Sequence, residues 1–189
     1  MLIWAINKIK ENPTKFQSTK VKEYKDGEVL KIGEEKYILK IDFKDKQSSS
    51  ASIIGEQIYL NISGNLSKEK QNEHISTLLS RLIGSKRLPI LKNKIDDLNK
   101  KLFNVEVKKI FFKNSQSRWG SCSNIGNINI STRLLFAPDD VLEYVCIHEL
   151  AHRIEQNHSE KFWELVKKAM PNYKEKEKWL KEHGNGLGF

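Results

Sequence analysis

The stretch HELAHRIEQNH, residues 148–158, is the most informative part of this sequence and holds three of its five histidines. His148 and His152 are four residues apart, so on a helix their side chains project from the same face. Two imidazoles on one face can bind one metal ion, and His158 is available as a third ligand. Catalytic zinc takes three protein ligands and a water, and Glu149 can act as the general base on that water. The stretch therefore predicts a hydrolytic site with one Zn²⁺ per chain.

The residues before this motif predict the helix that it requires. Pro138 suits the first turn of a helix, and Asp139 and Asp140 there favour the positive end of the helix dipole. Apolar residues such as Val145 and Leu150 then give the segment a face that can pack against a core. The first two metal ligands are therefore expected on a largely buried helix.

The segment between the second and third histidines must turn sharply. The spacing from His148 to His158 equals that of the metzincin pattern, which has a glycine where this chain has Glu155. We expect Gln156 and Asn157 to make the turn instead, because asparagine tolerates the left-handed conformation best after glycine.

A further helix is expected after the third histidine. Ser159 is a suitable N-cap, and Pro171 is expected to stop the helix. Phe162 and Trp163 are interpreted as packing residues that hold the loop with the third histidine. The glycine-rich end of the chain, HGNGLGF at residues 183–189, is predicted to be a flexible tail.

A compact motif, RWGSC, separates two predicted strands at residues 105–112 and 127–131. We expect these strands to pair in one sheet, with the turn between them near one end of the metal cleft. Arg118 there could hold an oxyanion or a phosphate; alternatively it pairs with an acid while Trp119 only packs. The strand NINIS, residues 127–131, is the expected edge to which a peptide would add. The candidate substrate-binding residues are Arg118, Trp119, Asn127 and Asn129.

The first half of the chain alternates apolar and polar residues before the period changes. Residues 37–43 and 58–62 are predicted to be two strands of a hairpin. Ser67 then caps an amphipathic helix that Gly84 can end, and Pro89 is suited to begin another. Strands and helices segregate along the chain, which predicts an α+β fold.

The size of the chain fits about one domain with a small appendage, since it has 189 residues. We expect a β-rich N-terminal segment at residues 1–66, a metallohydrolase core at 67–182 and the tail at 183–189. Two cysteines are too few for a disulfide framework and favour a reducing, cytoplasmic compartment. No apolar run approaches the ~18 residues of a membrane-spanning helix, so no membrane partner is expected.

The chain is basic, with 33 Lys and Arg against 24 Asp and Glu and a net charge of +9. Such a surface attracts nucleic acid or nucleotides. The lysines are spread along the whole sequence, however, so we expect weak nucleic-acid association at most, with a polypeptide or a nucleotide as the substrate.

Several segments together resemble one protein family, the YgjP-like metallopeptidases, formerly the domain of unknown function 45 and related to the SprT-like and WLM zinc peptidases. The matching segments are RWGSCS (118–123), GNINIS (126–131), RLLFAP (133–138), YVCIHELAH (144–152) and NHSEKFW (157–163). The resemblance extends from about Trp4 to Tyr173, nearly the whole chain.

The resemblance implies a zincin-like fold, in which a small, mostly antiparallel sheet packs on the active-site helix and further helices are present. It further implies zinc at His148, His152 and His158, with Glu149 catalytic. It also implies that the N-terminal β-rich segment is shortened, because the chain begins near the position of Trp4. Peptide-bond hydrolysis is the leading function. The alternatives are a metal-dependent nucleoside-triphosphate pyrophosphohydrolase and a DNA-associated SprT-like protease.

Overall fold

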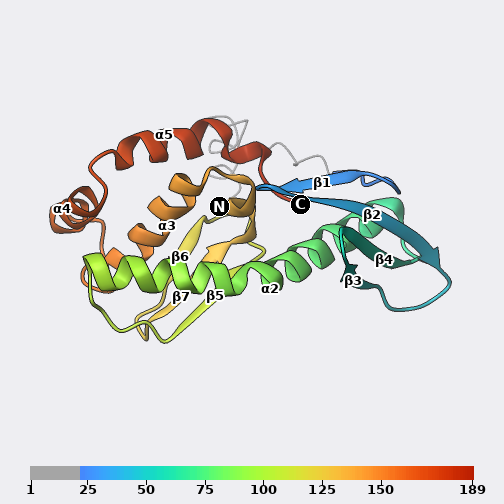
Figure 1. The fold of residues 1–189 in the computed structure, drawn as a ribbon, viewed down its shortest axis with the longest axis horizontal. Coiled ribbons are helices and arrows are strands. Elements are labelled where there is room, and N and C mark those ends of the chain that lie inside the picture. Colours follow the sequence, from blue (N-terminus) through green and yellow to red (C-terminus); the bar gives the residue numbers. More distant parts are fainter. Residues whose placement is uncertain (1–21) are drawn as a thin grey trace, which may run out of the picture.

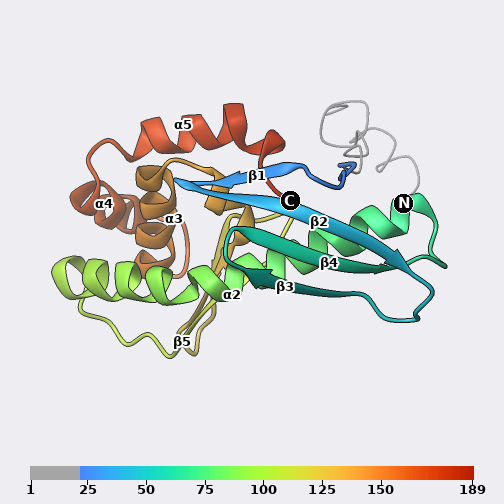
Figure 2. The same cartoon turned by 45° about the vertical axis from the view of Figure 1, so that its right-hand side comes forward.

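The computed structural model describes residues 22–189, which contain two groups of strands connected by one long helix (Figures 1 and 2). Predictions for residues 1–21, including the role of Trp4, lie outside the described part of the chain. The described residues contain helices, a four-stranded sheet and a three-stranded sheet, which confirms the α+β class. Within residues 22–189, no helix combines the length and apolar character that crossing a membrane requires.

The four-stranded sheet has the strand order β1-β2-β4-β3. Its strands are β1 (Val29–Ile32), β2 (Glu35–Lys44), β3 (Ser50–Ile54) and β4 (Gln57–Ser63). β2 and β4 pair in parallel, so the predicted hairpin between residues 37–43 and 58–62 is wrong. The hairpin partner of β4 is β3, because the tight turn at Gly55, which has a φ of 59°, joins those two strands. β3 was not expected from the sequence.

The long helix α2 (Lys68–Leu102) replaces two predicted helices. Ser67 caps it as expected, since its side chain accepts a hydrogen bond from the Lys70 backbone N–H. Neither Gly84 nor Pro89 interrupts it, which corrects the prediction. Apolar residues before and after the proline are buried in two separate clusters, and this burial outweighs the backbone hydrogen bond that proline cannot donate.

The three-stranded sheet has the order β5-β7-β6 and lies beside the helix with the histidine motif (Figure 1). Its strands are β5 (Lys109–Lys113), β6 (Gly120–Cys122) and β7 (Asn127–Ser131). β5 and β7 pair as predicted, although in parallel. The described chain thus has two small mixed sheets in place of the one, mostly antiparallel sheet that was expected. The expectation that NINIS forms an edge is also wrong, because β6 pairs with the free side of β7 and is itself the edge strand.

Three helices complete the described chain. They are α3 (Asp139–Ala151), α4 (Glu160–Ala169) and α5 (Tyr173–His183). Asp139 and Asp140 occupy the first turn of α3, and Ser159 caps α4 by accepting a hydrogen bond from the Phe162 backbone N–H, both as predicted. The α3 helix lies within the larger of the two buried clusters, which fixes its position against the three-stranded sheet and α5.

The C-terminal residues make several contacts, although the sequence favours a flexible tail there. The buried Arg133 in the short helix η2 (Thr132–Phe136) donates hydrogen bonds to the carbonyls of Gly184 and Leu187. The Phe189 ring lies 4.9 Å from the Phe136 ring, between centroids. The tail is thereby joined to the segment that leads into α3.

Candidate metal centre and active site

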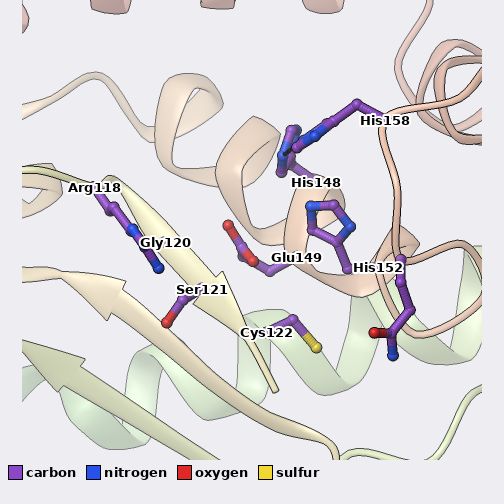
Figure 3. Close-up of a pocket in the computed structure, with 9 residues that line it drawn as sticks. Arg118, Gly120, Ser121, Cys122, His148, Glu149, His152 and His158 are labelled. Carbon is purple, nitrogen blue, oxygen red and sulfur yellow. Dashed lines mark hydrogen bonds between the residues drawn. The ribbon is translucent and has the colours of Figure 1, made fainter. Parts of the chain in front are cut away.

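Two of the three histidines are presented by the end of α3, as the four-residue spacing predicts. His148 lies in the last turn and His152 is the C-cap residue, and their ring centroids are 4.9 Å apart. Their side chains point to the same side of the helix, toward the edge strand β6 (Figure 3). The opposite side of α3 is buried, with Cys146 and Leu150 in the core.

The third histidine returns to the first two from the loop between α3 and α4. The His158 ring centroid lies 5.0 Å from that of His148 and 4.8 Å from that of His152. The fully buried Phe162 supports all three rings, with centroid distances between 4.5 and 4.8 Å. The packing role predicted for Phe162 is therefore confirmed.

The turn of this loop differs from the sequence-based expectation. Within residues 22–189, Asn104 is the only non-glycine residue with a positive φ, so Asn157 does not adopt the left-handed conformation. The loop is instead fixed by hydrogen bonds around Glu155. Its carbonyl lies 3.2 Å from the His152 Nδ1, and its side chain accepts from the Asn157 backbone N–H.

The three histidines are arranged as a metal site requires. Their candidate ligand atoms all lie within 4.8 Å of one another, and the Nε2 atoms of His148 and His158 are 3.0 Å apart. Two nitrogens on a tetrahedral zinc would be about 3.3 Å apart, given Zn–N bonds of about 2.0–2.1 Å. Because a carbonyl can only accept, His152 must donate from Nδ1, which leaves its Nε2 lone pair free for a metal ion. The group could hold a metal ion.

The protonation of these histidines also favours metal binding. Burial, and secondarily the neighbouring His152 and His158, lower the pKa of His148 to about 3. Burial likewise lowers the pKa of His152. Both imidazoles are therefore neutral near pH 7, which is the form that binds metal ions.

Glu149 is a buried carboxyl group beside the histidines. Only 5% of its surface is exposed, and its Oε2 has no hydrogen-bond partner in the structure. Burial raises its pKa to about 8, an effect that the positive charge of Arg118 partly opposes. The carboxyl group lies directly against Gly120, where an added Cβ would come within 2.8 Å of the Glu149 Cγ and Cδ. A side chain at position 120 would occupy the space of the carboxyl group.

These groups line one cavity of about 310 Å³ (Figure 3). The lining residues are Arg118, Gly120, Ser121, Cys122, His148, Glu149, His152, Gln156 and His158. The structure therefore brings the RWGSC motif to the three histidines, as the pairing of the flanking strands predicts. The cavity can accommodate a small group between the histidines, the free oxygen of Glu149 and the guanidinium of Arg118.

The four candidate substrate-binding residues lie at different distances from this cavity. Arg118 lines it, and no acidic side chain among residues 22–189 lies within 4.0 Å of its guanidinium, so the ion-pair alternative is wrong for the described chain. Trp119 lines a neighbouring cavity together with His148. Asn129 donates to Ser121 Oγ and lines another neighbouring cavity, while Asn127 lines neither the histidine cavity nor these two.

Arg133 was not predicted from the sequence as a residue that supports the site. Its guanidinium carbon lies 4.0 Å from the centroid of the Trp119 ring, and it donates a hydrogen bond of 2.8 Å to the Gln116 carbonyl. Trp119 is the residue next to Gly120, so this contact fixes the start of β6. A single arginine in the apolar segment RLLFAP was the available signal.

Three histidines that could hold a metal ion, beside a buried glutamate, are the kind of site found in metallopeptidases. The chain belongs to the YgjP-like family, whose metallopeptidase domain matches residues 2–183. No curated protein matches the chain.

Two solved structures from archaea are similar to part of the chain. The crystal structure of the metallopeptidase zymogen of Pyrococcus abyssi abylysin is 22% identical, with a TM-score of 0.45, over 49% of this chain and 93% of that chain. That of the metallopeptidase zymogen of Methanocaldococcus jannaschii jannalysin is 19% identical, with a TM-score of 0.43, over 49% of this chain and 94% of that chain.

Proposed function

We propose that this protein is a zincin-like peptidase that binds one Zn²⁺ through His148, His152 and His158 and uses Glu149 as the general base. The observation that carries the proposal is the buried carboxyl group of Glu149, whose unpartnered oxygen shares a cavity with the three histidines. When bound, the metal ion would lower the pKa of water and polarise the scissile carbonyl.

Beside the positive charge of a bound metal ion, the pKa of the Glu149 carboxyl group would fall, and the ionised Glu149 would take a proton from the attacking water and return it to the leaving amine. Its place against Gly120 supports this role, because the contact limits the positions open to the carboxyl group. The guanidinium of Arg118, in the same cavity, would orient the carbonyl oxygen and stabilise its developing negative charge.

The substrate backbone would add to the edge strand β6. β6 (Gly120–Cys122) pairs on one side only, and all three of its residues line the cavity beside Glu149. An extended peptide beside it would place a backbone carbonyl near the histidines, with main-chain hydrogen bonds supplying the affinity. This assigns to β6 the role that the sequence analysis gave to NINIS.

A nucleoside triphosphate is a less suitable substrate. Of the nine residues that line the cavity, Arg118 is the only lysine or arginine. Phosphate groups are bound by several cations or backbone N–H groups, and a single guanidinium next to a carboxylate does not provide them.

The test compares metal-loaded wild-type protein with Glu149→Gln. Both should contain one zinc per chain by elemental analysis, and only the wild type should cleave a denatured polypeptide, with a loss of at least about a thousandfold in the variant. Glu143→Gln is the matched control, since it makes the same chemical change on the same helix outside the cavity. Wild-type cleavage by the zinc-loaded Glu149→Gln protein would exclude the mechanism, and turnover of nucleoside triphosphates alone would favour the other function.

A further inference from the structure

A second cavity of about 370 Å³ adjoins the catalytic one. The two cavities share Arg118, Gly120, His148 and Glu149. The remaining walls of the second cavity are mainly apolar and are formed by Trp119, Tyr144, Val145 and Leu180. We call it the Leu180 cavity. A group bound there would lie next to the catalytic carboxylate.

The walls of the Leu180 cavity are held by contacts on their outer sides. Arg133 stacks on the Trp119 ring at 4.0 Å, and Gly184 lies so close to the ring that an added Cβ would come within 2.9 Å of its Cη2. The Tyr144 ring stacks with that of Tyr173 at 6.4 Å between centroids. A cavity with fixed walls loses little entropy when a ligand enters it.

The charges around the Leu180 cavity do not favour an ionic ligand. The two charged residues that α5 contributes, Glu177 and Lys181, pair with each other at 2.7 Å. Arg118 is shared with the catalytic cavity and lies there near Glu149. The apolar walls therefore favour an uncharged, apolar group.

We propose that the Leu180 cavity binds an apolar side chain of a polypeptide substrate, at a residue adjacent to the cleaved bond. This inference rests on the proposed peptidase function and adds a substrate class to it, namely polypeptides with a leucine-sized or phenylalanine-sized side chain beside the scissile bond. Leu180 on α5 forms the wall opposite the catalytic helix and sets the size of the side chain. The C-terminal helix thus determines the specificity of a site whose catalytic groups lie on α3.

The first experiment maps cleavage sites. Metal-loaded wild-type protein digests a mixture of denatured polypeptides, and mass spectrometry identifies the cleaved bonds. We expect leucine, methionine or phenylalanine to be enriched at one position next to the bond. Leu180→Phe should shift this preference to alanine and valine and lower kcat/KM for a leucine-containing peptide by about ten- to a hundredfold. Leu180→Ala should shift the preference toward larger side chains.

A matched control separates a change in specificity from a loss of folding. Leu165→Phe makes the same enlargement at a partly buried core position on α4, outside the Leu180 cavity, and should leave the preference unchanged. Zinc content and circular dichroism verify the fold of each variant, and Leu180→Val gives a milder change if Leu180→Phe does not fold.

A binding measurement tests the proposal without turnover. Zinc-loaded Glu149→Gln protein should bind a leucine-containing peptide about tenfold more tightly than its alanine counterpart in calorimetry, and Leu180→Phe in that background should abolish the difference. Cleavage without enrichment, or a preference that Leu180 variants leave unchanged, would overturn this inference while leaving the peptidase function intact. If the wild type cleaves no polypeptide, the proposed function itself fails, and equal binding of both peptides then also excludes the role of the Leu180 cavity.

Discussion

At the scale of single residues, Glu149 is a buried carboxyl group that lowers the stability of the fold when ionised and that the proposed mechanism uses as a base. A carboxyl group that is 95% buried and has an unpartnered oxygen is costly to ionise, which is why its pKa rises to about 8. The same desolvation makes the carboxylate a stronger base. The fold thus retains a local cost in stability at the position where the proposed hydrolysis needs a proton acceptor.

This cost predicts a pH-dependent difference in stability between two metal-free proteins. The folded wild type keeps the Glu149 proton up to about pH 8, whereas the unfolded chain releases it near the ordinary value of 4.5. The contribution of Glu149 is therefore fully present below pH 4.5 and is lost as the pH rises through 8. Glu149→Gln does not titrate, so it should exceed the wild type in free energy of unfolding by about 5 kcal/mol at pH 9 and match it near pH 4.

Urea unfolding with a chelator present, at several pH values, measures this difference. The buried histidines also affect the pH dependence of stability. Burial lowers the pKa of His148 from 6.5 to about 3, so this residue destabilises the fold when the pH falls below 6.5. That effect is common to both proteins and cancels in the comparison. A difference that does not change between pH 4 and 9 would contradict the burial-based interpretation of Glu149.

The third histidine should be necessary for tight metal binding. His158→Ala removes one of three nitrogen donors, and we expect the dissociation constant for zinc to rise at least about a hundredfold, because loss of even an outer-shell partner costs about ten- to a hundredfold. Competition with a chromophoric chelator measures the affinity. His74→Ala is the control, since His74 is an exposed histidine on α2. Unchanged zinc affinity in the His158 variant would show that the third ligand is another group.

At the scale of elements, Gly84 shows how a glycine can signal close packing rather than a helix end. It lies within α2 at the point where this helix crosses the three-stranded sheet. An added Cβ would come within 3.2 Å of the Phe112 Cβ and 3.3 Å of the Thr132 Cγ2. The absence of a side chain lets α2 approach β5 and η2 closely.

We predict that Gly84→Val destabilises the protein by about 1–3 kcal/mol, because the added methyl groups force α2 away from the sheet. Thermal and urea unfolding measure the change. Ser85→Val places the same side chain at the exposed neighbouring position and should alter stability by less than about 0.5 kcal/mol. Equal effects at both positions would indicate that helix propensity, and not packing, determines the result.

At the scale of the whole molecule, the C-terminus supports the site through Arg133. Deletion of residues 184–189 removes two of the three carbonyls that accept hydrogen bonds from this buried guanidinium, leaving the Gln116 carbonyl. We expect a loss of about 2–5 kcal/mol in the free energy of unfolding, because hydrogen bonds to a buried charged group are costly to leave unmade. Deletion of residues 188–189 alone keeps these bonds and should cost less. Equal unfolding free energies for the two deletions would refute the role of Arg133 as the link.

The features of this protein that depend on neighbouring residues could be predicted from the amino-acid sequence alone. The approach of His148 and His152 on one helix, the serine caps at positions 67 and 159, and the pairing of residues 105–112 with 127–131 were predictable. Each depends on a local pattern: the period of the helix, a side chain that reaches the first turn, or an apolar strand with a short connection. The division at residues 66 and 67 stays a prediction.

The placement of the strands, helices and side chains relative to one another became clear from the three-dimensional structure. The parallel pairing of β2 with β4, the continuity of α2 through Pro89, the edge position of β6 and the stacking of Arg133 on Trp119 all depend on segments far apart in the sequence. The amount of apolar surface that the whole fold buries decides whether two strands pair in parallel and whether a helix continues past a proline. No local pattern contains the total buried surface of the fold. The histidines that could bind a metal ion were therefore predictable from the sequence, whereas packing formed the cavities around them.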